Sequence, residues 1–210
     1  MSKKYRGKFP SDDIPNIIGP IGESIFDRPI WWCLDKETQG DLMIIFTQSL
    51  EHIVRIHDER LLLITGALLV EGSIDNLLSD FMPGYNALKD NRDFSFSLKI
   101  ALAKATELCP ASLFNYANLI RNMRNEFAHN LATSSIDQLP NKHIQTLNQY
   151  LTQISASYNL SVDNFKKCYD LISDTIFGIE IYRSSVQKLN RMIRDAEIEE
   201  LMRNYYKVVR

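Results

Sequence analysis

The feature that most constrains the fold is helical periodicity, which begins at Asp41 and continues to the end of the chain. Apolar residues recur at intervals of three and four, as at Leu147, Leu151 and Ile154. No alternation of apolar and polar residues typical of a strand appears, and neither does a hairpin signal. The sequence therefore predicts an all-α fold, a bundle of helices.

Turn residues and helix caps divide this helical part into separate elements. The expected helices span residues 41–82 (with a candidate break near 57–59), 97–108, 111–130, 142–158, 163–176 and 178–210, the last in one or two pieces. Residues 1–40 are expected to form an irregular N-terminal arm because they hold Pro10, Pro15, Pro20, Pro29, Gly19, Gly22 and Gly40. We therefore expect an arm over 1–40 and a single helical domain over 41–210.

The composition indicates a cytoplasmic protein. With 210 residues, 45% of them hydrophobic, the chain can bury a core without disulfides. Three cysteines are an odd number, which disfavours a secreted disulfide framework. The longest apolar run, Leu61 to Val70, has ten residues, about half of a membrane crossing. No apolar segment follows the basic N-terminus, so we expect neither a signal peptide nor a membrane contact.

The net charge is −2 and the pI is about 6.1, which disfavours a dedicated binder of duplex DNA. The charge is unevenly distributed, however. Residues 1–10 carry four basic side chains and no acid, and residues 41–82 carry seven acids against Arg55 and Arg60, a net of −5. Residues 183–210 carry seven basic and four acidic residues, a net of +3. This distribution leaves room for a local cleft that binds a polyanion.

A helical wheel separates residues 111–131 into two faces. The apolar face consists of Leu113, Tyr116, Ala117, Ile120, Met123, Phe127 and Leu131. The opposite face carries three amides and an imidazole, from Asn118, Asn122, Asn125 and His129. Asparagine is a poor helix former, and solvent would tolerate lysine or glutamate better. The amides therefore favour a polar interface or a ligand cleft, and a simply solvated face is the alternative.

Arg124 interrupts this division because it lies on the apolar face, about 40° from Ile120. A guanidinium keeps its charge and is costly to bury unpaired, so it needs an acidic partner or a wet cleft. The helix that ends near Phe81 has Glu71 on its own apolar stripe, together with Arg60. We therefore predict an ion pair between Glu71 and Arg124 that joins the two helices.

Residues 124–129 read Arg-Asn-Glu-Phe-Ala-His, which matches the R-x-x-x-x-H pattern of HEPN domains. Two preceding blocks, residues 60–71 and 96–104, give the span 55–137 a pattern that resembles the mannitol operon repressor branch of that superfamily. The resemblance implies an HEPN-like helical bundle with additional C-terminal helices.

In function, the resemblance implies a dimeric, metal-independent endoribonuclease, in the manner of a toxin or a phage-defence effector, that cleaves RNA by attack of the ribose 2′-hydroxyl. His129 would be the general acid–base, Arg124 would stabilise the pentavalent phosphorane, and Asn125 would position the ribose or His129. Glu71, Asn122 and Asn118 would support them. The expected partners are RNA, a second copy of the chain, and an antitoxin or regulatory protein.

Other interpretations of these residues remain open. Arg124 and His129 lie about 140° apart on a regular helix, so they serve one phosphate only across a dimer or where the helix distorts. His129 alternatively interacts with the helix dipole ahead of Asn130, and Arg124 alternatively serves only the pair with Glu71. The chain would then be a non-catalytic regulatory or protein-interaction module like the mannitol operon repressor, or a subunit that holds a small ligand.

The remaining motifs predict neither a metal nor a cofactor. His52 and His57 are spaced i,i+5 rather than i,i+4, and the chain lacks a phosphate-binding glycine loop and a serine nucleophile elbow. His143, which follows Pro140 at an expected helix start, is expected to be exposed.

Overall fold

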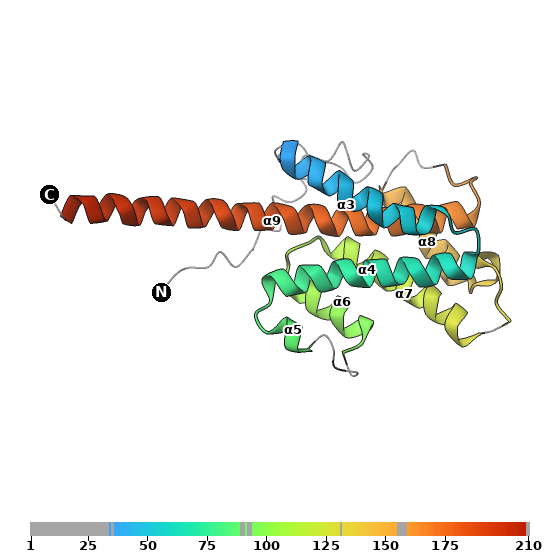
Figure 1. The fold of residues 1–210 in the computed structure, drawn as a ribbon. Coiled ribbons are helices and arrows are strands. Elements are labelled where there is room, and N and C mark those ends of the chain that lie inside the picture. Colours follow the sequence, from blue (N-terminus) through green and yellow to red (C-terminus); the bar gives the residue numbers. More distant parts are fainter. Residues whose placement is uncertain are drawn as a thin grey trace.

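The structure, a computed structural model, describes residue 34 and residues 36–88, 91, 94–130, 132–154 and 159–208. Every regular element among these residues is helical, so the predicted all-α fold is confirmed. In chain order the elements are α3 (Lys36–Val54), α4 (Glu59–Phe81), α5 (Tyr85–Leu88), α6 (Phe96–Ala105), α7 (Ala111–His129), the 3-10 helix η2 (Ile136–Gln138), α8 (Asn141–Ile154) and α9 (Asn164–Val208) (Figure 1).

The break expected near 57–59 is confirmed, because α3 ends at Val54 and α4 begins at Glu59. The Asp58 side chain caps α4 by accepting a hydrogen bond from the Leu61 N–H at 2.7 Å. The expected start of the first helix at Asp41 is five residues late, since α3 begins at Lys36. Of the predicted arm over 1–40, only residues 34 and 36–40 are described.

The C-terminal helix α9 is one continuous helix of 45 residues, so the prediction of a separate helix over 163–176 is wrong. Its N-cap prediction is confirmed, because the Asp163 side chain accepts a hydrogen bond from the Lys166 N–H at 2.7 Å. Gly178 lies inside this helix rather than at a break. A Cβ atom at Gly178 would come within 2.6 Å of Leu113 Cδ2, so this glycine allows α9 to approach α7 closely.

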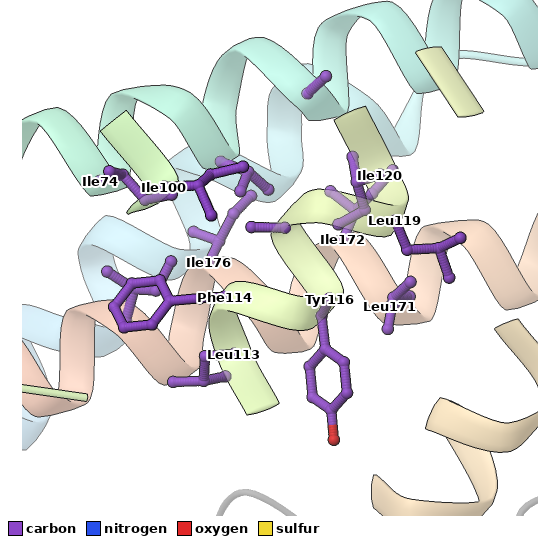
Figure 2. Packing of buried hydrophobic residues seen from close by; sticks show 14 of the residues in the cluster. Ile74, Ile100, Leu113, Phe114, Tyr116, Leu119, Ile120, Leu171, Ile172 and Ile176 are labelled. Atoms are coloured by element: carbon purple, nitrogen blue, oxygen red, sulfur yellow. The ribbon is translucent and has the colours of Figure 1, made fainter. Parts of the chain in front are cut away.

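The core lies where α4, α6, α7 and α9 meet, with α4 in contact with the other three and with α3. Figure 2 shows apolar side chains from these four helices pointing toward one another, including Ile74, Ile100, Phe114, Ile120, Ile172 and Ile176. Gly66 on α4 permits a close approach to α9, because a Cβ atom there would lie 2.4 Å from Ile172 Cδ1. The apolar face of α7 is thus fixed against the centre of the bundle.

The first half of α9 is packed and its second half extends away. Ile179, Ile181 and Val186 are buried, and Arg183 forms an ion pair with Asp80 at the end of α4. The whole helix is about 70 Å long. Figure 1 shows its C-terminal half reaching well beyond the other labelled helices.

By length and composition α4 is the one helix among the described residues that is apolar enough to cross a membrane. Half of its most apolar window is buried inside the protein. Its apolar character therefore also suits its position as the helix that contacts α3, α6, α7 and α9.

Candidate functional site

Helix α7, which carries the predicted site, has a buried face and an accessible face, as the helical wheel predicts. Its apolar residues are buried, namely Leu113, Phe114, Tyr116, Ala117, Leu119, Ile120, Met123 and Phe127. Leu131 lies outside the described residues. The helix stays regular through the motif and ends at His129, after which the Asn130 N–H donates to the Glu126 carbonyl at 3.0 Å. The motif therefore lies on the last two turns of an undistorted helix.

The opposite face of α7 is accessible. Asn118 and His129 are exposed, and Asn122, Asn125 and Arg124 are half-buried. Neither Asn125 nor His129 hydrogen-bonds to another described residue through its side chain. The structure thus places the amides and the imidazole on one face, with Arg124 nearer the bundle, and leaves Asn125 and His129 available to a ligand.

Arg121 is a member of this face that the sequence analysis did not single out. Its Nε donates to Asn118 Oδ1 at 3.2 Å, and its Nη2 donates to Asn122 Oδ1 at 2.8 Å. The wheel places Arg121 at the border between the two faces, which is why it was missed. The signal that identifies it is the spacing i,i+3 from Asn118, which places the two side chains next to each other on a helix.

The predicted ion pair between Glu71 and Arg124 is wrong. Glu71 instead pairs with Lys99 on α6, with Lys99 Nζ at 2.7 Å from Glu71 Oε1. Arg124 forms no hydrogen bond or ion pair with any residue that the structure describes. It is a half-buried cation to which the described residues offer no acidic partner.

The direction of the helices explains this error. Arg60 near the start of α4 reaches Phe127 near the end of α7, and the two helices run in roughly opposite directions (Figure 1). Glu71 lies eleven residues beyond Arg60 along α4, whereas Arg124 lies only three residues before Phe127. The two side chains are therefore offset by roughly 12 Å along the helix axes, too far for an ion pair.

Glu71 belongs to a partly buried polar cluster formed by α4, α5 and α6, which we call the Lys99 cluster: Lys99, Glu71, Asp75 and Tyr85. Lys99 Nζ lies 2.9 Å from Asp75 Oδ2, and the Tyr85 hydroxyl donates to Asp75 Oδ1. Burial alone lowers the pKa of Lys99, but the hydrogen bonds and charges of Glu71 and Asp75 outweigh it and raise the pKa above its ordinary value. Burial, and then Asp75, raises the pKa of Tyr85. Glu71 therefore stabilises the fold rather than the motif.

Arg60 caps the end of the motif helix. Its Nη2 donates to the Phe127 carbonyl at 2.6 Å and to the Asn130 carbonyl at 3.2 Å. The last carbonyls of a helix have no partner within it and carry the negative end of its dipole, so a guanidinium is a favourable partner. Because Arg60 fills this role, the last turn of α7 does not need His129 for capping.

The back of the motif helix is held by α8. Glu126 Oε1 lies 3.5 Å from His143 Nε2. His143 is buried rather than exposed as expected, because α8 packs this side of its first turn against α7 and α9. Glu126, the one acidic residue in α7, therefore contacts α8, while its side chain stays 39% exposed.

Among the described residues, no three potential metal ligands from histidine, cysteine, aspartate or glutamate gather at one point.

Comparison of the chain with models of protein families, with curated proteins and with solved structures finds no match to any of them.

Proposed function

We propose that the protein is a cytoplasmic, metal-independent endoribonuclease of the HEPN type that acts as a homodimer. The observation that carries the proposal is that Arg124 is half-buried and unpaired among the described residues, on the helix that also carries the half-buried Asn125 and the exposed His129. A guanidinium kept partly out of water without an acidic partner carries a desolvation cost that a bound phosphate would offset.

Each motif residue has a role in this chemistry. The ribose 2′-oxygen attacks the adjacent phosphorus as the P–O5′ bond breaks, which yields a 2′,3′-cyclic phosphate and a 5′-hydroxyl. His129 transfers protons between these oxygens, for which an imidazole is suited at neutral pH. Arg124 stabilises the charge that develops on the phosphorane, and Asn125 positions the ribose or His129.

The regularity of α7 is the reason for proposing a homodimer. In an undistorted helix Arg124 and His129 point about 140° apart, so one chain cannot direct both side chains at one phosphate. A two-fold dimer would bring Arg124 of one copy and His129 of the other to the same cleft. The exposed position of His129 at the end of α7 suits such a shared site.

The test incubates purified protein with single-stranded RNA in the presence of EDTA and identifies the ends of the products by mass spectrometry. Cleavage to cyclic-phosphate and 5′-hydroxyl ends is expected for the wild type, with a loss of about 10²-fold or more in His129→Ala and in Arg124→Met. His57→Ala is the matched control, because His57 is equally exposed but lies between α3 and α4. It should cleave like the wild type.

Mixing the two inactive variants tests the shared cleft. A mixed dimer of Arg124→Met and His129→Ala chains keeps one complete site out of two, so random exchange should restore about a quarter of the wild-type rate. RNA left intact by folded wild-type protein would overturn the nuclease proposal. That outcome would favour the alternative, a non-catalytic module that binds an antitoxin or another regulatory protein.

A further inference from the structure

The hydrogen bonds of Arg121 determine how the side-chain amides of Asn118 and Asn122 are oriented. Arginine carries only donors, so the amide atom 2.8 Å from its Nη2 must be the oxygen of Asn122, and the same holds for Asn118 at 3.2 Å from Nε. Each amide therefore turns its NH2 group away from Arg121. The cluster presents amide N–H donors, and it keeps the positive charge of the guanidinium.

Arg121 forms no ion pair with any residue that the structure describes. The one acid in α7 is Glu126, four residues after Asn122, and its Oε1 lies 3.5 Å from His143 Nε2 on α8. Arg121 has five N–H donors and uses one on Nε and one on Nη2, so three remain for a ligand. Donors around an unneutralised cation match a phosphodiester, which offers only acceptors and a negative charge.

We infer that Arg121, Asn118 and Asn122 form a phosphate-binding subsite that holds a single-stranded RNA along α7. The inference rests on the proposed nuclease function and adds a second contact to it. Asn122 lies seven residues before His129, about 10 Å along the helix axis. One strand laid along α7 therefore places a neighbouring phosphate at this subsite while the scissile phosphate lies at the motif.

The decisive variant is Asn122→Asp, made in His129→Ala protein so that the RNA is not cut. Aspartate has the shape of asparagine and still accepts the hydrogen bond from Arg121, so the fold and the cluster remain. Its outward atom becomes an acceptor, which opposes a phosphate. We expect the Kd for a fluorescent single-stranded RNA, measured by anisotropy, to rise about tenfold or more.

Asn76→Asp is the matched control, because Asn76 is an exposed helical asparagine and the net charge changes equally, but it lies on α4. Its Kd should stay close to that of His129→Ala alone. In Arg121→Met, the slope of log Kobs against log salt should fall by about 0.7, the loss of one phosphate contact to a single strand. A single-stranded DNA of the same sequence should show both effects, since the subsite contacts phosphate rather than the 2′-hydroxyl.

The outcomes separate this inference from the nuclease proposal. Weaker binding in Asn122→Asp than in Asn76→Asp supports the subsite even if the wild type cleaves no RNA. Equal binding by these two variants overturns the subsite even if the wild type cleaves RNA. Absence of RNA binding by folded His129→Ala protein also overturns it.

Discussion

The Lys99 cluster and the outer face of α7 both hold charged groups on helices of the same bundle, but they differ in what balances the charge. Lys99 is buried and has two carboxylates within 2.9 Å. Arg124 is half-buried and has no partner among the described residues, while on the same helix Asn125 is half-buried and His129 is exposed. The charge of Lys99 is balanced by carboxylates of the same chain, whereas the charge of Arg124 is balanced only when a ligand binds.

A charged residue on the inward face of a helix can therefore have one of two roles. A charge that finds its counter-charge inside the protein joins helices, and removing it affects folding. A charge that remains unpaired next to exposed polar groups contributes little to folding and is free to act on a ligand. The sequence patterns of the two cases are alike, so only the partners tell them apart.

The largest effect is expected from Lys99→Met, which should lower the free energy of unfolding by about 3 kcal/mol. The substitution leaves Glu71 and Asp75 with uncompensated charges in a site where their side chains are only 20% and 27% exposed. Urea unfolding followed by circular dichroism measures the change. A loss below that of a typical surface substitution would show that the Lys99 cluster does not hold the helices together.

The pH dependence of the free energy of unfolding is a second, independent test of the Lys99 cluster. The pKa values of Lys99 and Tyr85 are both raised in the folded protein above their ordinary values of 10.5 and 10.0. A raised pKa stabilises the protonated folded state, so this contribution is complete below about pH 10 and is lost as the pH rises beyond it. The stability difference between the wild type and Lys99→Met should therefore stay constant from pH 7 to about pH 10 and then shrink.

A smaller effect is expected from Arg60→Met. Arg60 connects the two regions because its side chain extends from α4 to the end of α7. Loss of a guanidinium that caps the Phe127 and Asn130 carbonyls should cost about 1 kcal/mol. Amide hydrogen exchange should accelerate at Asn130, whose N–H closes the last turn, more than at residues in the middle of α7. Uniform acceleration along α7 would instead mean that Arg60 stabilises the whole bundle.

Much of the fold could be predicted from local patterns. The buried and exposed faces of α7 follow from a period of 3.6 residues, and the break between α3 and α4 follows from the polar residues there. The continuity of α9 could not be predicted, because a glycine at a helix break and a glycine at a close contact look alike in sequence. Only the approach of Leu113 shows that Gly178 is of the second kind.

The two faces of α7 could be predicted, but the partners of the charged residues could not. A wheel places Glu71 and Arg124 on inward stripes, yet it contains no information on how far one helix is shifted along another. Lys99, the partner that Glu71 actually has, lies on the ten-residue helix α6, which offers too few turns to define a face clearly. Arg121 was missed because the wheel places it at the border between the two faces of α7, where only its hydrogen bonds to Asn118 and Asn122 assign it to the polar face.

The smallest effect is expected from Arg124→Met, which should change the free energy of unfolding by no more than about 0.5 kcal/mol. An ion pair with Glu71 would instead make this change as costly as the loss of Lys99. A double-mutant cycle with Glu71→Gln separates the two cases: the effects of Arg124→Met and Glu71→Gln should add, because the residues do not interact, while those of Lys99→Met and Glu71→Gln should not. A coupling energy above about 1 kcal/mol between Glu71 and Arg124 would return Arg124 to a structural role and remove the main support for its role in phosphate binding.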